Sequence, residues 1–363
     1  MYRVALIGAG MIANAGHIPA WRNLSQEVEI VAVFDVDPAR AAATAERHGI
    51  AKSYGDHEAM LGELSPDIVS VCTPNAYHKQ YAIAALEAGA NVFCEKPIGT
   101  SFADAQAMYA AAEQAGKRLM VSQTARWSSE AMAAKQLAES GALGEIYYGE
   151  TAILRRRGTP QWGQFHIKSA SGGGPIYDLG VHMLDRLLWI MGNPRVIAVS
   201  AATYAKLANQ ERQLETSLAA SGAPIGVYDP RPFSRSEFDV EDMAAAFIRL
   251  ESGATIAFKT SWAVNLPDGY GDTVLAGTQA GLRLDPLTLF GGVGDYQADI
   301  TPVVPQQPDT PFYGHWLATE HFVRVLQGHE TMIVQPAEVL NVMRTLDAMY
   351  QSAATGAEVR LER

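Results

Sequence analysis

Cysteine, long apolar runs and positive charge are all scarce in this chain. Only two of its 363 residues are cysteines, Cys72 and Cys94, and both lie in apolar segments. Reduced thiols of this kind are typical of a cytoplasmic protein rather than of a disulfide-stabilised one. No run approaches the ~18 apolar residues of a membrane-spanning helix. Because Met1-Tyr2-Arg3 leads straight into a strand-like segment, we expect no basic leader either.

Acidic residues outnumber basic ones. The 39 Asp and Glu residues exceed the 28 Lys and Arg residues, which gives a formal net charge of −11 at pH 7. Nucleic acids and anionic membranes need a basic surface, and the longest basic run, Arg155-Arg156-Arg157, is too short to predict one. We therefore expect no nucleic-acid or membrane partner, and chemistry on a small molecule is the default expectation. At about 150 residues per domain, the length predicts two or three domains.

Residues 1–122 alternate between short apolar runs and Ala-rich helical stretches. Apolar strands without polar alternation, joined by helices, indicate a parallel sheet that is covered on both faces. The expected strands span residues 4–7, 30–34, 68–72, 91–94 and 119–121, and the expected helices include residues 38–48, 78–88 and 102–115. This doubly wound α/β arrangement is the predicted first domain.

The pattern changes near residue 123. Residues 123–363 contain several expected strands that follow one another without an intervening helix, and Glu251-Ser252-Gly253 indicates a hairpin turn. We therefore predict an α+β second domain with an open, mostly antiparallel sheet. The expected strands span residues 146–154, 196–204, 243–250, 254–262 and 272–277, the expected helices span 130–140, 316–327 and 336–353, and residues 206–239 indicate a polar insertion or lid.

A glycine-rich motif follows the first expected strand. Gly8 and Gly10 permit a tight turn and a close approach of the backbone to a pyrophosphate, and Ala13 allows the next helix to pack closely on the sheet. The beginning of that helix, at Met11 and Ile12, offers N–H donors to a phosphate.

Asp35 ends the second expected strand, about 20 residues beyond the glycine motif. A carboxylate there accepts hydrogen bonds from a ribose 2′-OH, so the motif and the acid together predict a dinucleotide site. The alternative is a tight structural turn followed by a surface aspartate. Because a carboxylate repels a 2′-phosphate, NAD is favoured over NADP, although Arg40 is close enough in sequence to reach such a phosphate.

Three further motifs give the chain its resemblance to a known family. They are Cys72-Thr73-Pro74-Asn75-Ala76-Tyr77-His78, Glu95-Lys96-Pro97, and a glycine-rich stretch, Gly172-Gly173-Gly174, that leads to Asp178-Leu179-Gly180-Val181-His182. The first two follow expected strands of the parallel sheet, at the edge where such sheets bind ligands. In order and spacing, together with the glycine motif and Val240-Glu241-Asp242, they resemble the Gfo/Idh/MocA family of glucose–fructose oxidoreductase and inositol dehydrogenase relatives over nearly the whole chain.

The resemblance implies a Rossmann domain that binds NAD, followed by a domain with an open, largely antiparallel sheet. It implies that Lys96 lies beside the nicotinamide and the substrate, and that Asp178 and His182 face it across the cleft. It also implies a cofactor and substrate contact for Arg126, which follows the last strand of the first domain. Further cofactor contacts are expected from Thr73, Pro74, Asn75, His78 and Glu95, with a backbone bond favoured over proton transfer for His78.

Asp178 and His182 are four residues apart, so an α-helix over residues 176–191 would place them on one face, with Asp185 a turn further along. His182 then takes the hydroxyl proton of an alcohol, Asp178 orients the imidazole or binds a neighbouring hydroxyl, and Lys96 stabilises the developing charge on the oxygen. The plain alternative is that Asp178 caps the helix, His182 packs inside and Lys96 is solvated. No further His or Cys cluster supports a metal site at Asp178, His182 and Asp185, so we expect no metal.

The segment before the glycine-rich stretch carries further candidates for substrate contact. Arginine offers forked donors to hydroxyls or phosphates, and tryptophan offers a flat apolar face to a sugar ring. We expect Arg155, Trp162, His166 and Lys168 to line the substrate mouth, against the alternative that Arg155-Arg156-Arg157 is a solvated strand edge. In the insertion, Tyr228, Arg231 and Phe233 are candidates to cover the site.

These residues predict an NAD-dependent oxidoreductase that moves a hydride between the nicotinamide and a secondary alcohol, or the matching ketone, of a sugar, inositol or related polyol. One alternative is an enzyme that holds NAD tightly and uses transient oxidation to cleave, eliminate from or epimerise a glycoside. Another is a non-catalytic nucleotide-binding sensor. Because an open sheet with one uncovered face is commonly buried against another subunit, we also expect a homodimer or homotetramer.

Overall fold

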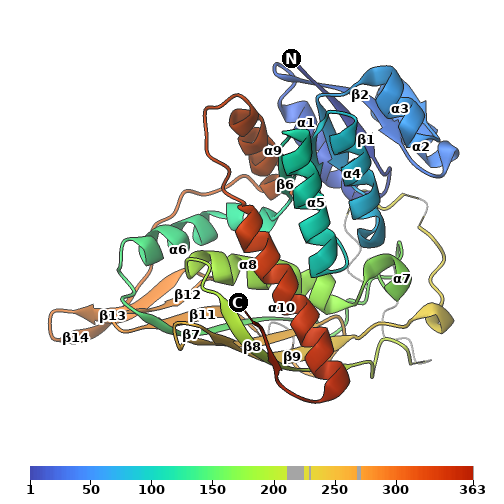
Figure 1. The fold of residues 1–363 in the computed structure, drawn as a ribbon. Coiled ribbons are helices and arrows are strands. Elements are labelled where there is room, and N and C mark those ends of the chain that lie inside the picture. The colour runs from blue at the N-terminus through green and yellow to red at the C-terminus, as the bar shows by residue number, and fades with distance from the viewer. Residues whose placement is uncertain (211–224, 229, 268–270, 363) are drawn as a thin grey trace.

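Two β-sheets, one above the other, organise the chain in the computed structural model, which describes residues 1–210, 225–228, 230–267 and 271–362 (Figure 1). The first third of the sequence builds one sheet, and the remainder builds the other. The predicted fold class, a doubly wound parallel sheet followed by an α+β unit, is therefore confirmed.

Six parallel strands form the first sheet. They are β1 (Tyr2–Ile7), β2 (Val28–Phe34), β3 (Lys52–Tyr54), β4 (Ile68–Val71), β5 (Asn91–Cys94) and β6 (Leu119–Val121). Their order is β3-β2-β1-β4-β5-β6, and each neighbouring pair is parallel. The order reverses between β1 and β4, and α/β sheets bind ligands at the carboxyl ends of the strands beside such a reversal. The sequence missed β3, because its three residues are half-buried or exposed at the sheet edge and carry no apolar run.

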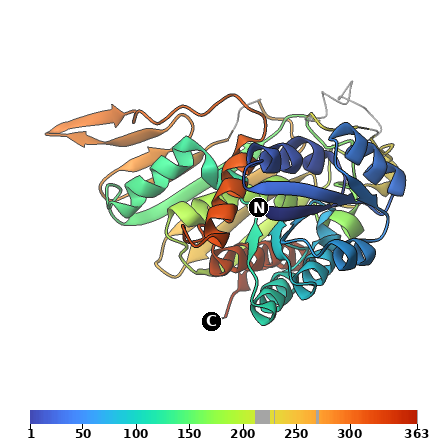
Figure 2. The ribbon, with the colours of Figure 1, turned by 90° about the horizontal axis from the view of Figure 1, so that it is seen from above.

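Helices connect these strands and cover the sheet (Figure 2). Side-chain caps explain where several of them begin, because Asp37, Asp56 and Ser101 each accept backbone N–H groups of the following turn. The helical elements are η1 (Ala13–His17), α1 (Ile18–Asn23), α2 (Pro38–Arg47), α3 (His57–Leu64), η2 (Asn75–Tyr77), α4 (His78–Glu87), α5 (Phe102–Ala115) and η3 (Thr124–Trp127).

Nine strands form the second sheet. They are β7 (Ile146–Leu154), β8 (Val196–Tyr204), β9 (Met243–Leu250), β10 (Thr255–Ser261), β11 (Thr273–Gly277), β12 (Gly281–Arg283), β13 (Thr288–Val293), β14 (Tyr296–Ile300) and β15 (Val359–Arg360). Their order is β14-β13-β12-β11-β7-β10-β9-β8-β15. Among the strands of this sheet in the described ranges, only the central β7–β10 pair is parallel, so the sheet is mixed and mostly antiparallel, as the sequence predicts.

The helical elements of the second unit are α6 (Ser129–Glu139), α7 (Lys168–Ser171), η4 (Ile176–Gly180), α8 (Val181–Ile190), η5 (Arg235–Glu237), α9 (Tyr313–Leu326) and α10 (Pro336–Thr355). Of these, α8 and α10 pack on the face of the second sheet that is turned toward the first sheet (Figure 1). Gly149 in β7 allows Leu187 of α8 to pack closely, because an added Cβ would lie 3.4 Å from the leucine side chain. None of the helices in the described ranges covers the opposite face of this sheet (Figure 1).

The β13–β14 hairpin projects from the body of the protein (Figures 1 and 2). Its tip is strongly exposed, with 80% of the Tyr296 surface accessible to solvent. The sequence did not predict β12 to β14, because the glycines and mixed exposure of this region hide the strand alternation. In the described part of the chain, no helix is both long and apolar enough to cross a membrane.

Helix α9 returns from the second unit to the first sheet. The Phe322 ring lies 5.8 Å from that of Phe93 in β5, and the Gln327 amide donates to Glu27 at 2.7 Å. Helix α10 also contacts the first unit, because the Asp347 carboxylate accepts the backbone N–H of Phe102 at the beginning of α5. The helices around the first sheet therefore come from both ends of the sequence.

Candidate active site

The glycine motif makes the turn that the sequence predicts. Gly8 has a φ of +99°, and a Cβ there would lie 2.8 Å from the carbonyl of Cys72, so only glycine fits between β1 and β4. No atom lies within 4 Å of the position that a Cβ on Gly10 would take, which leaves its backbone open on that side. Ala13 is fully buried against the sheet at the beginning of η1.

Asp35 lies at the end of β2 beside this turn. One of its carboxylate oxygens accepts the N–H of Ala9 at 2.9 Å, and the other accepts the N–H of Asp37 at 3.0 Å. A carboxylate has about four acceptor positions, so lone pairs remain for a ribose hydroxyl. The Arg40 guanidinium lies 3.6 Å from the Asp35 carboxylate and is half exposed. It is therefore the positive group in this region that could bind a 2′-phosphate.

The loops after β4 and β5 are joined by His78. Its two ring nitrogens lie 2.8 Å from the carbonyl oxygen of Thr73 and 2.7 Å from that of Pro97. These backbone contacts agree with the interpretation that the sequence favoured, but the side chain is fully buried. His78 therefore positions the two loops, and its expected cofactor contact stays a prediction.

Both carboxylate oxygens of Glu95 bind groups of the protein. One of its oxygens accepts hydrogen bonds from His17 at 2.7 Å and His315 at 2.9 Å, and the other accepts the N–H of Lys96 at 3.2 Å. Only 5% of the residue is exposed. The described contacts of Glu95 thus lie within the protein, and its expected cofactor contact stays a prediction.

Lys96 meets the second unit at Asp178. The Lys96 ammonium donates to the backbone oxygen of Asp178 at 2.8 Å and to its carboxylate at 3.3 Å, although 82 residues separate the two. The indole of Trp262 donates to the other carboxylate oxygen at 2.9 Å. Burial works against the ionised form, but the charges of Lys96 and Arg155 and the Trp262 bond hold the pKa of Asp178 below its usual value.

The segment that carries Asp178 and His182 is not the continuous α-helix that the sequence predicts. It begins with the π-helical turn η4, and α8 begins only at Val181. Gly180 packs against the Phe258 ring, where a Cβ would lie 2.7 Å away. Asp178 is therefore no N-terminal cap, because its carboxylate binds Lys96 and Trp262 instead.

His182 lies one turn beyond Asp178. Burial, reinforced by the positive charge of Lys96, lowers the pKa of His182 to about 3, so the imidazole is neutral near pH 7. Its Nδ1 is buried without a hydrogen-bond partner in the described structure, and the side chain as a whole is half-buried. A neutral imidazole of this kind is suited to accept a proton.

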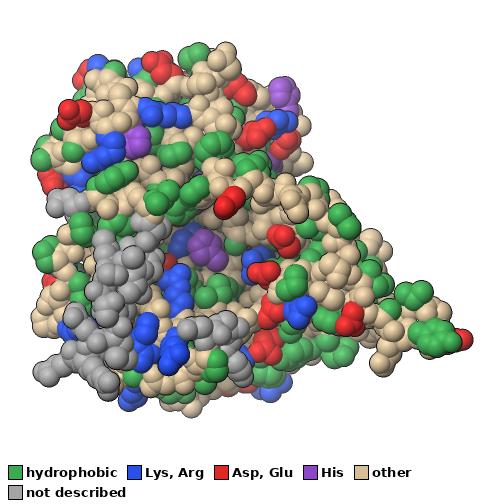
Figure 3. Space-filling view, turned by 180° about the vertical axis from the view of Figure 1, so that it is seen from behind, with side chains coloured by type: hydrophobic (Ala, Val, Ile, Leu, Met, Phe, Trp, Pro, Cys, Tyr) green, Lys and Arg blue, Asp and Glu red, His purple; other side chains and the backbone are tan. Residues whose placement is uncertain are grey.

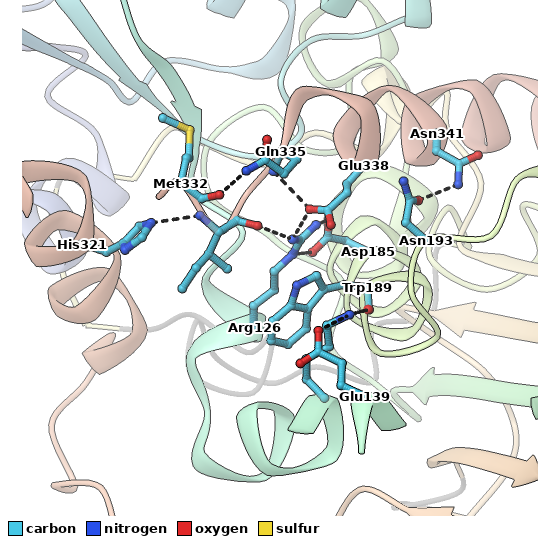
Figure 4. Close-up of polar contacts among 12 residues, drawn as sticks. Arg126, Glu139, Asp185, Trp189, Asn193, His321, Met332, Gln335, Glu338 and Asn341 are labelled. Atoms are coloured by element: carbon cyan, nitrogen blue, oxygen red, sulfur yellow. Dashed lines mark hydrogen bonds and ion pairs between the residues drawn. The ribbon is translucent and has the colours of Figure 1, made fainter. Parts of the chain in front are cut away.

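The polar atoms of Arg126 are bound within the protein. Its side chain is fully buried and binds Asp185 through two bonds of 2.6 and 2.7 Å, Glu338 at 2.5 Å and the Ile333 carbonyl at 3.2 Å (Figure 4). These bonds form a buried ion-pair network that joins η3, α8 and α10, and the expected substrate and cofactor contacts of Arg126 stay a prediction. Because Asp185 belongs to this network, it is not available for the metal site considered with Asp178 and His182.

The segment after β7 is divided between buried and exposed side chains. Trp162 and His166 are 7% and 1% exposed, and their ring nitrogens have no partner in the described structure. Arg155 is half-buried and its charge acts on Asp178, whereas Arg156 and Lys168 are exposed. The described parts of the insertion also lie near this segment, because the Phe233 ring is 4.6 Å from the His166 ring. Arg231 forms an ion pair with Glu237. Residues 211–224 lie outside the described ranges.

A hollow opens between the two units on the face shown in Figure 3. A histidine side chain lies in it, and Lys or Arg side chains line one side. The nearby loops fit a dinucleotide, because the Gly10 backbone is open on one side and two buried oxygens, Thr73 Oγ1 and Gln123 Oε1, lack partners within the described structure. Of the other expected contacts, Pro74 is exposed and the Asn75 amide donates to the Ser171 carbonyl at 2.8 Å.

Three important residues were missed by the sequence analysis. Trp262 follows β10, His17 lies nine residues beyond Gly8, and His315 belongs to α9. Each was hidden because its partner is distant in sequence, up to 220 residues for His315 and Glu95. His17, a histidine within the first helical segment, is the one local feature of the sequence that pointed to these contacts.

Two family models together match almost the whole chain. One, described as oxidoreductase family, NAD-binding Rossmann fold, matches residues 2–123, and the other, the C-terminal alpha/beta domain of the same oxidoreductase family, matches residues 135–361. The chain belongs to the Gfo/Idh/MocA family of oxidoreductases. The predicted family and the prediction of an oxidoreductase with a nicotinamide-binding Rossmann domain are confirmed.

Individual members of the Gfo/Idh/MocA family match over nearly their full length. The chain is 33% identical to D-glucoside 3-dehydrogenase of Escherichia coli K12, over 99% of this chain and 97% of the relative. It is 28% identical to D-xylose 1-dehydrogenase (NADP(+)) 2 of Haloferax volcanii, over 98% and 99%. The solved structure of levoglucosan dehydrogenase in complex with NADH and L-sorbose shares the fold, with a TM-score of 0.82, 23% identity and coverage of 100% and 99%.

Proposed function

We propose that this protein is an NAD-dependent dehydrogenase that interconverts a secondary alcohol and the corresponding ketone on a sugar or related polyol. The observation that carries the proposal is the meeting of Lys96 with Asp178, 2.8 and 3.3 Å apart, one turn before the neutral His182. An ammonium donor, a carboxylate and a neutral imidazole are the groups that alcohol oxidation needs around one oxygen atom.

Each residue has a role in the reaction. His182 accepts the hydroxyl proton, so the O–H bond breaks as an N–H bond forms on the imidazole. Lys96 donates a hydrogen bond to the same oxygen and stabilises its negative charge, while Asp178 holds the ammonium in place. When bound, the nicotinamide supplies the acceptor for the hydride that leaves the carbon.

The substrate class follows from relatives as well as from the site. The relatives that cover nearly the whole chain are named for dehydrogenation of a D-glucoside and of D-xylose, which favours carbohydrate substrates. For the cofactor, the Asp35 carboxylate favours NAD over NADP, because it repels a 2′-phosphate. The two buried free cysteines favour a cytoplasmic location, and the uncovered face of the second sheet favours a homodimer or homotetramer.

The experiment follows NADH absorbance during incubation with NAD and a panel of glycosides, aldoses, inositols and anhydrosugars. We expect turnover with at least one sugar, and a loss of roughly 100-fold or more in kcat for Lys96→Ala and His182→Ala, because each removes a group from the reacting oxygen. NAD binding, followed by tryptophan fluorescence, should persist in both. The exposed residues Lys79 and His329 provide matched controls, Lys79→Ala and His329→Ala. Full activity in the two active-site variants would refute the assigned roles.

One observation favours a second candidate, an enzyme that retains its NAD and oxidises the sugar only transiently. Residues 225–228 of the insertion lie against the glycine-motif helix: a Cβ on Gly226 would lie 2.6 Å from that of Ala15, and the Tyr228 ring lies 3.8 Å from the Arg47 guanidinium. Because the glycine motif is where the pyrophosphate is expected, we infer that this segment slows the release of a bound dinucleotide. If the purified protein releases a stoichiometric amount of nucleotide only on denaturation, the enzyme that retains its NAD is favoured. Rapid exchange of the bound nucleotide with labelled NAD would exclude this candidate.

A further inference from the structure

The stretch at 240–242, which the proposed reaction leaves unused, contacts the glycine-rich motif that precedes η4. One carboxylate oxygen of Glu241 accepts the N–H of Gly174 at 3.0 Å, and the other accepts the N–H of Ile176 at 3.1 Å. The phenol of Tyr350, from α10, donates to the second oxygen at 2.8 Å. Because Glu241 is buried, these three donors surround its carboxylate in the protein interior.

The glycines of the motif leave room for these contacts. A Cβ on Gly173 would overlap the Tyr350 hydroxyl, and a Cβ on Gly174 would overlap the backbone oxygen of Glu241. That oxygen cannot move aside easily, because the pairing of β9 with β10 begins two residues further along the chain. Only glycine lacks a Cβ, so the motif needs glycine at these two positions for α10 and the beginning of β9 to approach its backbone.

The two backbone bonds of Glu241 fix the beginning of the segment that carries Asp178. The first N–H groups of a helix have no partner within the helix, and a carboxylate at this end satisfies them. Here the segment begins with the π-helical η4, and a π-helical turn is a rare geometry that is found mostly at functional sites. Ile176 is the first residue of η4, so Glu241 binds the backbone only two residues before Asp178.

The next residue, Asp242, holds a partner of Asp178. The backbone oxygen of Asp242 accepts the N–H of Trp262 at 2.8 Å, directly beyond the paired residues of β9 and β10. The Trp262 indole donates to one carboxylate oxygen of Asp178 at 2.9 Å, and the Lys96 ammonium lies 3.3 Å from the other. Residues 241 and 242 therefore fix both backbone segments that meet at the Asp178–Trp262 hydrogen bond.

Only a carboxylate satisfies the donors around Glu241. The N–H groups of Gly174 and Ile176 can only donate, and each faces a different oxygen, so the side chain must accept on both sides. An amide in the same place would turn its NH2 group toward one of these N–H groups in either orientation. Burial raises the pKa of Glu241, whereas the bonds from the two N–H groups and Tyr350 favour its ionised form.

We propose that Glu241 is a positioning residue, which holds η4 in the register that brings Asp178 to Lys96. Tyr350 orients the Glu241 carboxylate for this role. The inference rests on the proposed dehydrogenase function, in which Asp178 holds the Lys96 ammonium at the reacting oxygen. Glu241 acts through the backbone at the beginning of η4 and exchanges no proton with the substrate. Without its bonds Asp178 and Lys96 shift, and a displacement of about 1 Å at reacting groups costs roughly 100-fold in rate.

The test compares kcat, the Kd of NAD and one NMR signal between the wild type and Glu241→Gln. We expect kcat for sugar oxidation to fall by roughly 10- to 100-fold, while the Kd of NAD stays unchanged, because the glycine motif after β1 keeps its contacts. The indole Nε1–H resonance of Trp262, assigned with Trp262→Phe, should move upfield as its bond to Asp178 weakens. A purely structural role of Glu241 would lower Tm and leave kcat and this resonance of the folded protein unchanged.

Glu251→Gln is the matched control. Glu251 lies directly beyond the opposite end of β9, where it pairs with Arg195 at the surface, so its replacement should change none of the three measurements. Tyr350→Phe keeps the volume of the side chain and both backbone bonds of Glu241. It should therefore give a smaller change of the same kind, and it provides the measurement if Glu241→Gln does not fold.

Wild-type kcat in folded Glu241→Gln, or in Tyr350→Phe where only that variant folds, overturns the inference. If the wild type oxidises no sugar, the proposed function fails, and the Trp262 resonance then decides the inference separately. A resonance that moves upfield in Glu241→Gln supports the positioning of Asp178 by Glu241, and a resonance at the wild-type position refutes it.

Discussion

Replacement of Arg126 by methionine should destabilise the whole fold. The guanidinium is fully buried, and its four contacts include the carboxylates of Asp185 and Glu338 (Figure 4). Methionine fills a similar volume but leaves the Asp185 charge buried without a partner. Breaking a buried ion pair in this way costs about 3–5 kcal/mol of unfolding free energy, which corresponds to a fall in Tm of roughly 4–7 °C for a chain of this length.

The loss of unfolding free energy in Arg126→Met should depend on pH. Burial already raises the pKa of Asp185 although Arg126 opposes this, and loss of the guanidinium raises it further, so the folded variant binds the extra proton. Its stability is then retained at pH values below the unfolded pKa and is lost as pH rises through the folded pKa. Scanning calorimetry at pH 5 and pH 8 should therefore show the larger deficit at pH 8. Arg195→Met, which breaks the exposed pair with Glu251, is the matched control and should cost less than about 1 kcal/mol. A loss below about 1 kcal/mol in Arg126→Met, or one that is equal at both pH values, would refute the reasoning.

Two further predictions concern the cofactor and the ion pair at the site. Asp35→Ser should lower the preference for NAD over NADP by at least tenfold in kcat/KM, because it removes the charge that repels a 2′-phosphate. Asp37→Ser, at the exposed cap of α2, should leave the ratio of the two kcat/KM values unchanged. The same ratio in Asp35→Ser as in the wild type would refute the assignment of Asp35 to the ribose 2′-OH. Trp262→Phe should lower kcat 10- to 100-fold, because it removes a hydrogen bond to a charged group that is worth on the order of 1.5–3 kcal/mol. It should also raise the pKa of Asp178, since the Trp262 bond helps to hold that pKa down. The acid limb of the pH profile would then move up, and a profile that moves down or stays fixed would contradict the role of Trp262.

Local patterns were enough for the elements that pack against the core. Strands β7, β8 and β9 and helix α5 have the bounds that the sequence predicts, because each carries an uninterrupted apolar or helical pattern that the tertiary structure does not override. The short edge strand β3 and the projecting β13–β14 hairpin were missed, since exposed strands carry no such pattern. The π-helical η4 was missed because the spacing of apolar residues does not distinguish it from an α-helix.

Local sequence patterns also failed to predict the partners of charged residues near the candidate site. The motifs predicted the loops that carry Lys96, Asp178 and His182, because these motifs lie at strand and helix ends. They did not predict that Arg126 would bind Asp185, 59 residues away, and Glu338, 212 residues away. Partners so distant in sequence are brought together by the packing of α8 and α10, which no local spacing encodes.

The return of α9 to the first sheet has a consequence for the order in which a newly made chain matures. The motif at Glu95 leaves the ribosome 220 residues before His315 does. At ~5–20 residues per second, that interval is roughly 10–45 s. During this time the nascent first sheet holds a carboxylate that has one of its two imidazole donors, and the α1 surface lacks the helix that will cover it. A chaperone that binds apolar surface therefore has a defined target on this nascent chain, and release from that target should coincide with the synthesis of α9.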